Sequence, residues 1–435
     1  MRIPTALTIA GSDSGGGAGI QADLKTFAVM GVHGMAAITS VTAQNTVEVR
    51  AIHDIPPHVV VAQIEAVADD IGVDAAKTGM LSNKEIIEAL AKPLDRYGFP
   101  LVVDPVMIAK SGAKLLRDDA IEALKRVVIP RATLVTPNAP EAERLTGIRI
   151  TGVREAREAA RMIVEEYGAE AAIVKGGHLE GSHSVDVLYY KGRTIEYKMP
   201  RIHKDTTHGT GCAFSAAIAA GLAKGRSLPE AVEVAKRFIT MAIDYGLPIG
   251  KGHGPVNPVA WQEIPAERHR VLEDLAEAVR ILQSNQAQVA KLIPEVQMNI
   301  AMALPQPYAR TPMDVAAIPG RIARHRGGIL VKASPEFGAS RHLANIILEA
   351  SRVNPRIRAA ANVALVEGIE DALDRMGIEA RRSQGRLAIQ LREWGEVPDA
   401  VVLGKEPGRE PLVILFAPRA SEVAGRIVAL ARMLD

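Results

Sequence analysis

The feature that most constrains the fold is the alternation of short apolar runs with longer helical segments over about the first 250 residues. Several runs are apolar on both faces, as strands buried inside a parallel sheet must be. The predicted strands are TALTIAG, AAITSVTAQN, DAAKTGM, PLVVDPVM, ATLVTPN and AAIVKGG. Helical periodicity lies between them, at residues 58–71, 83–97 and 154–167. This rhythm predicts an α/β fold with a doubly wound, mainly parallel sheet, and such sheets bind ligands outside the carboxyl ends of their strands.

The pattern of apolar and polar residues changes after Pro258, and we place a domain boundary near residue 262. A connector leads into an amphipathic helix of about 18 residues that begins near Pro265. Beyond it, the predicted strands are MNIAMAL, GGILVKA, RLAIQLR and PLVILFA, and the predicted helices are residues 342–352, 369–376 and 420–433. Residues 1–262 and 263–435 are therefore expected to form two domains. The second is a smaller α/β or α+β domain whose strand order stays open.

Composition excludes several classes of protein. The 435 residues include 52 Lys and Arg against 50 Asp and Glu, so the net charge of +2 gives no electrostatic reason for a nucleic-acid or membrane partner. The single Cys excludes an intramolecular disulfide and a Cys-based zinc site. No uncharged apolar run approaches the ~18 residues of a membrane span, and the first residues lack the layout of a signal peptide. The expected compartment is the cytosol.

A glycine-rich segment, GSDSGGGAGIQAD at residues 11–23, follows the first predicted strand. Its match to a G-x-G-x-x-G pattern is loose, and a flexible strand–helix turn is an equally good interpretation. The functional interpretation is a backbone that approaches a small ligand closely, which only glycine permits.

Two further strand ends carry carboxylates, Asp104 in DPVM and Glu141 in TPNAPE. A carboxylate from each could hold Mg²⁺ through water, because this ion prefers oxygen ligands and keeps several waters. Each alone reads equally well as a helix cap or as an acidic residue beside a helix dipole.

The most specific motif is HGTGCAFSAA at residues 208–217, where small residues open an Ala-rich helix. The free N–H groups and the dipole of such a helix start form an anion site that suits a phosphate in transfer. Cys212 lies in the first turn, where the positive end of the helix is expected to lower the thiol pKa. The alternative is a tight turn around a buried, unreactive Cys.

Residues 1–260 resemble the hydroxymethylpyrimidine/phosphomethylpyrimidine kinases of the ribokinase-like superfamily. The resemblance rests on motifs that occur in the order of that family: GSDSGGGAGIQADLKT, VTAQNT, KTGML, DPVM, TPNAPEAERLTG, VKGGH and HGTGCAFSAAIAA. Most ribokinase relatives carry Asp where this sequence has Cys212, whereas the pyrimidine kinases carry Cys. The resemblance implies a ribokinase-like sheet, ATP as co-substrate, Mg²⁺, and two successive phosphorylations of a pyrimidine alcohol.

The resemblance also assigns roles to single residues. It implies pyrimidine contacts from Gly11, Asp23, Gln44, Met80 and Val106. It implies contacts with the nucleotide or the transferred phosphate from Asn138, Lys175, Gly209, Thr210 and Gly211. Asp104 and Glu141 are implied as the metal ligands, and Cys212 as the residue that activates the substrate hydroxyl. Without the family, Lys175 reads as a solvated strand-end lysine, and Cys212 could act either as a base or through its backbone N–H alone.

The informative stretch of the second part is IPGRIARHRGGILVK at residues 318–332, followed by SRH at residues 340–342. Basic side chains follow glycine turns here, and SRH opens a helix, so the stretch is a credible cradle for phosphate or diphosphate oxygens. A solvated basic surface is the plainer interpretation. The lack of zinc-ligand spacing and of aromatic interleaving argues against nucleic acid.

Residues 265–435 resemble the archaeal-type thiamine-phosphate synthase domain, which is often fused behind the pyrimidine kinase. The resemblance rests on MNIAMALPQPYARTPMDVAAIPGRI, FGASRHLANIILEA and PDAVVLGKEPGREPLVILF. It implies Arg321 and His342 as catalytic residues. Position suggests Lys332 and Arg341 as phosphate contacts, and Asn299 as a further activity candidate. Some members are fused instead to DNA-binding domains and only sense thiamine phosphate, but no helix-turn-helix segment is left over in this sequence.

The sequence thus predicts a bifunctional enzyme of thiamine biosynthesis. The first domain would make the pyrimidine diphosphate with two ATP, and the second would join it to a thiazole phosphate and release pyrophosphate. The expected partners are these small molecules, with no nucleic acid and no membrane, and the kinase family implies a homodimer. Two alternatives stay open: a second domain that only senses thiamine phosphate, and a kinase for another alcohol such as pyridoxal.

Overall fold

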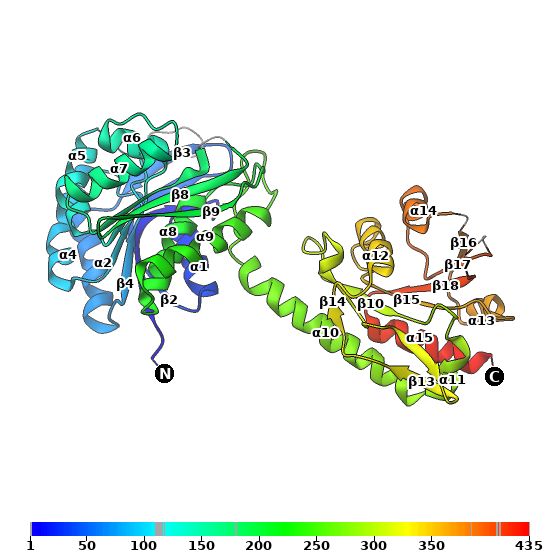
Figure 1. Cartoon of the computed structure of the whole chain (residues 1–435). Helices are drawn as coiled ribbons and strands as arrows, with labels where there is room; N and C mark the ends of the chain where they lie inside the picture. Colours follow the sequence, from blue (N-terminus) through cyan, green and yellow to red (C-terminus); the bar gives the residue numbers. More distant parts are fainter. Residues whose placement is uncertain are drawn as a thin grey trace. The chain divides into compact units, whose positions relative to one another are not determined.

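A computed structural model describes residues 2–108, 116, 118–178, 181–383, 385–405, 408 and 410–434. The chain divides into two compact units, Met1–Gln262 and Glu263–Asp435, which are described separately (Figure 1). Among the described residues, none of the helices combines the length and the apolar character that a membrane span requires.

The first unit is built on a nine-stranded sheet with the order β3-β2-β1-β4-β5-β6-β7-β8-β9. The strands are β1 (Thr5–Asp13), β2 (His33–Gln44), β3 (Val49–Asp54), β4 (Ala75–Thr78), β5 (Leu101–Val103), β6 (Leu134–Val135), β7 (Ala171–Val174), β8 (His183–Tyr190) and β9 (Arg193–Pro200). The six neighbouring strands β2, β1, β4, β5, β6 and β7 run parallel. The remaining strands pair antiparallel: β3 with β2, β8 with β7, and β9 with β8. The predicted doubly wound, mainly parallel sheet is confirmed.

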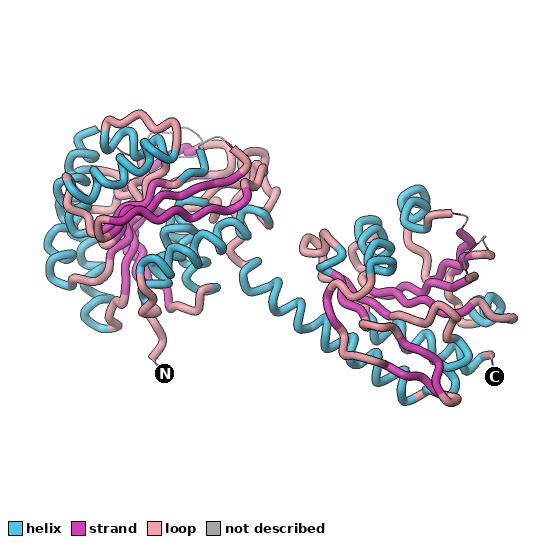
Figure 2. Tube along the Cα trace, in the orientation of Figure 1, coloured by secondary structure: helices cyan, strands magenta, loops and turns pink. Residues whose placement is uncertain are grey.

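Helices cover both faces of this sheet (Figure 2). They are α1 (Gly19–Val29), α2 (Pro57–Asp70), α3 (Lys84–Ala89), α4 (Ala91–Tyr97), α5 (Asp118–Val127), α6 (Ala139–Thr146), α7 (Val153–Glu165), α8 (Thr210–Ala223) and α9 (Leu228–Asp244). Successive strand residues face opposite layers, as the pleat requires. Val103 packs in the core beneath α2, α3, α5 and α7, whereas Val102 packs with α1, α8 and α9.

The helix predicted at residues 83–97 is divided into α3 and α4. Pro93 has no N–H to donate to the carbonyl of Ala89, the residue at which α3 ends. The strands β3, β8 and β9 were not predicted, because their partly exposed residues do not form continuous apolar runs; β3 and β9 are the two edges of the sheet, and β8 lies beside β9.

The second unit has a seven-stranded sheet with the order β14-β11-β10-β15-β18-β17-β16, and a separate hairpin of β12 and β13. The strands are β10 (Ile300–Ala303), β11 (Val315–Ala317), β12 (Ile322–His325), β13 (Gly328–Val331), β14 (Glu336–Phe337), β15 (Ala359–Ala364), β16 (Ala380–Ser383), β17 (Ala400–Leu403) and β18 (Leu412–Ala417). The helices are α10 (Ala260–Ser284), α11 (Gln286–Val289), α12 (Arg341–Val353), α13 (Ile369–Arg375), α14 (Leu387–Trp394) and α15 (Ala420–Met433). Among the described strands of this unit, only β16 and β17 pair in parallel, so this smaller α/β unit has a mainly antiparallel sheet.

Two predictions for this unit need correction. The helix expected near Pro265 begins at Ala260, after Asn257, whose side-chain oxygen accepts a hydrogen bond from the N–H of Val259. The strand predicted at RLAIQLR is wrong, because this segment lies in α14. Leu387 and Leu391, four residues apart, are buried, whereas Ile389 between them is 51% exposed, so the burial follows the helical period and not the strand period.

Candidate active site

The first unit contains a cavity of about 790 Å³ at the carboxyl ends of its parallel strands. Its wall includes most of the residues for which the sequence predicted a role in this unit. They are Gly11, Gln44, Met80, Asp104, Val106, Asn138, Glu141, Lys175, Gly209, Thr210, Gly211 and Cys212. Segments that lie up to about 200 residues apart in the chain therefore meet at one site, as parallel strands allow.

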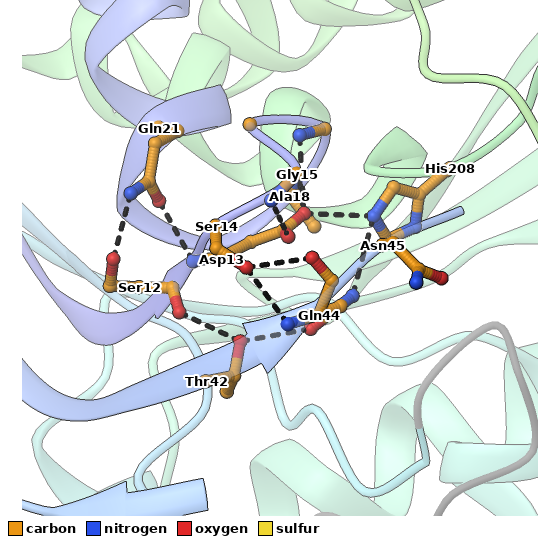
Figure 3. Close-up of polar contacts among 12 residues, drawn as sticks. Ser12, Asp13, Ser14, Gly15, Ala18, Gln21, Thr42, Gln44, Asn45 and His208 are labelled. Atoms are coloured by element: carbon orange, nitrogen blue, oxygen red, sulfur yellow. Dashed lines mark hydrogen bonds and ion pairs between the residues drawn. The ribbon is translucent and has the colours of Figure 1, made fainter. Parts of the chain in front are cut away.

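The carboxylate of Asp13 organises the glycine-rich loop between β1 and α1 (Figure 3). Its Oδ1 accepts a hydrogen bond of 2.8 Å from the N–H of Gly15. Its Oδ2 accepts hydrogen bonds of 3.1 and 2.8 Å from the N–H groups of Gly17 and Ala18. Ala18 is the N-cap residue of α1 and has no side-chain cap of its own, so Asp13 takes over that task.

The same Oδ2 accepts a hydrogen bond of 2.9 Å from Nε2 of His208, in the loop before α8. The imidazole also lies 3.4 Å from the amide nitrogen of Gln44, at the end of β2. Burial alone would raise the pKa of Asp13, but the hydrogen bonds from His208, Gly15 and Ala18 outweigh burial and lower it. Asp13 therefore stays ionised and joins the two glycine-rich loops.

The two loops approach each other so closely that a side chain is impossible between them. A Cβ on Gly209 would lie 1.8 Å from the carbonyl oxygen of Gly17, and the φ of Gly209 is +79°. Asp13 and His208 were not among the predicted site residues. Both stand inside the quoted motifs, but the signal that joins them is spatial.

An ion pair between Lys175 and Asp104 lies beside the first turn of α8. The Nζ of Lys175 lies 2.9 Å from Oδ1 of Asp104, and the lysine side chain is only 14% exposed, so the solvated-lysine interpretation is wrong. Burial alone would lower the pKa of Lys175, but Asp104 and Glu141 outweigh it and raise the pKa. A Cβ on Gly211 would lie 3.2 Å from this Nζ, so the first turn of α8 comes directly against the ion pair.

Asn138 and Glu141 serve two purposes at once. They form the capping box of α6: the N–H of Glu141 donates to Oδ1 of Asn138 at 2.9 Å, and the N–H of Asn138 donates to Oε2 of Glu141 at 2.8 Å. Both also line the cavity, so the cap and the candidate metal ligand are the same carboxylate. Burial raises the pKa of Glu141 to about 7; the Lys175 ammonium opposes this rise, and the Asp104 carboxylate adds to it.

Cys212 lies in the first turn of α8 and lines the cavity, as predicted, but its acidity is not what the sequence indicated. Burial raises the pKa of the Cys212 thiol to about 11, and the nearby Lys77 ammonium offsets only part of this rise. The prediction of a lowered pKa is therefore wrong, because desolvation of the thiolate outweighs the positive helix end.

Asp23 does not lie in the cavity wall. It is fully buried in α1, where its Oδ2 accepts hydrogen bonds of 2.9 Å from Nζ of Lys77 and 2.7 Å from the hydroxyl of Thr8. Burial alone would lower the pKa of Lys77, but the Asp23 carboxylate and the other negative groups nearby, among them Asp104, together outweigh it and raise the pKa. A motif cannot show which face of its helix a residue takes, and here the carboxylate faces a buried ammonium.

The far end of the cavity is formed by residues for which the sequence predicted no role. Among them, Lys236 of α9 and Asp186 of β8 form a buried ion pair of 2.8 Å. Arg201, just after β9, also lines this end. Asp186 and Arg201 belong to the unpredicted edge hairpin, so the sequence gave no indication that they reach the site.

In the second unit, Arg321 follows Gly320 in the turn between β11 and β12 and has a φ of +60°. Its guanidinium donates to the carbonyl of Val296. The side chain of Lys332 lies beside the same turn, because a Cβ on Gly320 would be 3.3 Å from Cδ of Lys332. Arg341 and His342 lie in the first turn of α12, as predicted, and both are exposed, which also fits the plainer interpretation of a solvated basic surface.

Asn299, a candidate from its position alone, bonds to the backbone around it. Its side-chain oxygen accepts hydrogen bonds from the N–H groups of Ile300 and Ile318, and its amide nitrogen donates to the carbonyl of Ile318. Asn299 is buried and so holds the strand that enters the Gly320–Arg321 turn.

The raised pKa of Glu141 predicts a pH-dependent stability. Because the folded chain holds the Glu141 proton more tightly than the unfolded chain, the contribution is complete below the ordinary pKa of 4.5 and is lost as the pH rises through about 7. Glu141→Gln stays neutral throughout. The free energy of unfolding of the parent should therefore fall relative to that of Glu141→Gln between about pH 5 and pH 8.

Urea titrations followed by tryptophan fluorescence measure this difference. Trp261 packs against Phe238 of α9 at 5.7 Å, so in a Trp394→Phe background its emission reports the loss of this packing against the first unit. A difference between the two variants that stays constant or grows with pH would contradict the assignment.

Comparison with known proteins agrees with this geometry. Residues 13–257 match the family model "Phosphomethylpyrimidine kinase", and residues 274–429 match "Thiamine-phosphate synthase ThiN". A hydroxymethylpyrimidine/phosphomethylpyrimidine kinase of Bacillus subtilis is 50% identical over 264 residues, which cover 60% of this chain and 97% of that protein. The thiamine biosynthesis bifunctional protein ThiED of Geobacter sulfurreducens is 51% identical over 263 residues, which cover 60% of this chain and 54% of that protein.

Solved structures share the fold of the first unit. A Bacillus subtilis pyridoxal kinase in an ADP complex matches with a TM-score of 0.56 and 41% identity, covering 60% of this chain and 98% of that one. A phosphomethylpyrimidine kinase of Clostridium difficile matches with a TM-score of 0.50 and 46% identity, covering 56% of this chain and all of that one. The family predicted from the motifs is confirmed: the chain belongs to the phosphomethylpyrimidine kinase family and carries a thiamine-phosphate synthase domain behind its kinase domain.

Proposed function

We propose that the first unit transfers phosphoryl groups from two ATP, one after the other, to 4-amino-5-hydroxymethyl-2-methylpyrimidine and then to its monophosphate. The observation that carries this proposal is the meeting of the Lys175–Asp104 ion pair with the first turn of α8 in one cavity. Phosphoryl transfer requires mainly positioning and charge stabilisation, and an ammonium beside free helix N–H groups supplies both. Gly11, Gln44, Met80 and Val106 offer a half-apolar wall for the pyrimidine ring.

Asp104 and Glu141 suit Mg²⁺ at this site. They supply carboxylate oxygens, the donors that this ion prefers, and burial together with Asp104 raises the pKa of Glu141, so a cation there would relieve the unfavourable charge. When bound, Mg²⁺ would neutralise phosphate oxygens of ATP. In this proposal Lys175 holds the transferred phosphoryl group. The N–H groups at Gly211 and Cys212 donate hydrogen bonds that stabilise its developing negative charge.

The pKa of about 11 makes the Cys212 thiol a mostly protonated group at neutral pH. This supports the interpretation in which the α8 backbone, and not a thiolate, carries most of the rate. We expect Cys212→Ser to keep turnover within about tenfold of the parent, because the helix start is unchanged. Gly211→Ala should lower kcat/KM by about 10²-fold for both phosphorylations, because its Cβ would press on Lys175.

Steady-state kinetics on each pyrimidine substrate measure both effects. A loss of 10² or more with Cys212→Ser, on the order expected for a missing general base, would instead assign proton abstraction to the thiolate.

One specific observation supports pyridoxal as an alternative alcohol substrate. The solved structures that share this fold include pyridoxal kinases of Bacillus subtilis and Staphylococcus aureus, at 41% and 35% identity. We rank the pyrimidine first, because the kinases named for it reach 50% identity. Side-by-side kcat/KM values for pyridoxal and the pyrimidine alcohol decide between them.

For the second unit we propose the coupling reaction. The thiazole nitrogen attacks the methylene carbon of the pyrimidine diphosphate, the carbon–oxygen bond breaks, and pyrophosphate leaves with its electron pair. The aminopyrimidine ring can stabilise positive charge at that carbon, so the protein must chiefly stabilise the leaving diphosphate. Arg321 beside Lys332, and Arg341 with His342 at the start of α12, are the cations and donors that suit it.

One assay tests both halves. The full chain receives ATP, Mg²⁺, the pyrimidine alcohol and thiazole phosphate, and thiamine phosphate is measured. A second reaction supplies the pyrimidine diphosphate directly. Product in both supports the whole proposal, whereas tight binding of thiamine phosphate without turnover in the second reaction would show a sensing domain.

Arg321→Ala and His342→Ala should each stay folded, keep full kinase activity and lose about 30- to 1000-fold in thiamine-phosphate formation, equivalent to 2–4 kcal/mol of transition-state stabilisation. Arg321→Lys should restore the rate only in part, because an ammonium lacks the planar fork of a guanidinium. The rates are measured with pyrimidine diphosphate supplied. Arg326, another exposed arginine with positive φ, provides the matched control, and Arg326→Ala should behave as the parent.

If both Ala variants turn over like the parent, the assignment of these two residues is wrong. A loss that appears equally in Arg326→Ala would also overturn it, because the effect would then follow net charge and not the site.

A further inference from the structure

The described residues that follow β7, 176–178 and 181–183, are contacted by an arginine that follows a different strand. The guanidinium of Arg201, just after β9, donates to four backbone carbonyls of this segment. They are those of Gly177 at 2.7 Å, Gly181 at 2.8 Å, His183 at 3.2 Å and Gly176 at 3.3 Å. Four bonds from one planar group fix several peptide orientations together, which a single donor could not do.

A buried ion pair holds the same segment from the other side. The N–H of Gly176 donates to Oδ1 of Asp186 at 2.8 Å, and Oδ2 of Asp186 lies 2.8 Å from Nζ of Lys236. Lys236 also donates to the hydroxyl of Ser184 at 3.0 Å. Both charged side chains are about 6% exposed, so each would be left with an unpaired buried charge if the other were lost.

Gly176 is therefore fixed at both of its backbone polar groups, with its N–H on Asp186 and its carbonyl on Arg201. The close approach leaves no room for a side chain, because a Cβ on Gly176 would lie 1.9 Å from the carbonyl oxygen of Val185. The preceding residue is Lys175, whose N–H donates to the carbonyl of Pro137 at 2.9 Å. The backbone from which the Lys175 ammonium extends to Asp104 is thus held on both sides.

We propose that Arg201 is a positioning residue for nucleotide binding: together with Asp186 and Lys236, it fixes Gly176 and thereby sets Lys175 where the phosphates of ATP are bound. The inference rests on the proposed kinase function and deepens it. Arg201 acts through the backbone carbonyls, so its loss should loosen the segment even when no nucleotide is present.

The test compares Arg201→Met and Arg201→Lys with the parent and with Arg193→Met, a control at the exposed start of β9, the strand that Arg201 follows. The KM for ATP should rise about tenfold or more in Arg201→Met, while the KM for the pyrimidine alcohol stays within about twofold. Arg201→Lys keeps the charge but should restore little, since an ammonium cannot reach four carbonyls at once. Arg193→Met should match the parent.

Hydrogen exchange of the full chain without nucleotide separates positioning from direct contact. Backbone amides at residues 176–178 and 181–183 should exchange faster in Arg201→Met, with an unchanged midpoint of thermal unfolding. A raised KM for ATP with unchanged exchange would assign Arg201 to direct phosphate contact and overturn the inference. Equal rises in both KM values with a lowered midpoint, or a parental KM for ATP in a folded variant, would also overturn it.

If Arg201→Met does not fold, Arg201→Lys carries the same comparison, because it retains the long side chain. The activity of the parent distinguishes a failure of this inference from a failure of the proposed function. A parent without ATP-dependent phosphorylation overturns the function, whereas an active parent with indifferent Arg201 variants overturns only the positioning role.

Discussion

The kinase site depends on the hydrogen bonds that the carboxylate of Asp13 accepts. One buried negative charge accepts hydrogen bonds from three backbone N–H groups of the β1–α1 loop and from the imidazole of His208, 195 residues further along the chain. The donors of Gly17 and His208 are buried, and buried donors are costly to leave unsatisfied. The loop that lines one side of the cavity and the loop that opens α8 therefore keep their shape together.

Buried ion pairs organise the first unit, two of them in the cavity wall and one outside it. Lys175 is paired with Asp104, Lys236 with Asp186, and Lys77 with Asp23, and all three ammonium groups are largely buried. Glu141 caps α6 and faces the same cavity, where burial raises its pKa to about 7. Glu141 thus caps α6 and lines the cavity, so its capping role is compatible with the metal-ligand role that we propose for it.

The sequence predicts the features that depend on a local pattern of residues, and it does not predict those that depend on burial or on tertiary contacts. The parallel strands were predicted because burial on both faces leaves continuous apolar runs, whereas the edge hairpin β8–β9, with Asp186 and Arg201, leaves none. RLAIQLR was misassigned because apolar residues at a spacing of two mask a buried pair at a spacing of four. The fall expected for the pKa of Cys212 was wrong because burial is a property of the fold and does not show in a motif. The Asp13–His208 contact is purely tertiary, and no local pattern contains it.

Asp13→Asn tests the central claim most directly, because Asn keeps the size of the side chain but replaces acceptors of three N–H groups and an imidazole by an amide that satisfies only part of them. The measurement is kcat/KM for phosphorylation of the pyrimidine alcohol, with thiamine-phosphate formation from supplied diphosphate as the internal control for the intact second unit. We predict a fall of about 10²-fold or more in kinase kcat/KM with unchanged synthase activity. A folded Asp13→Asn chain that phosphorylates the alcohol like the parent would contradict the account.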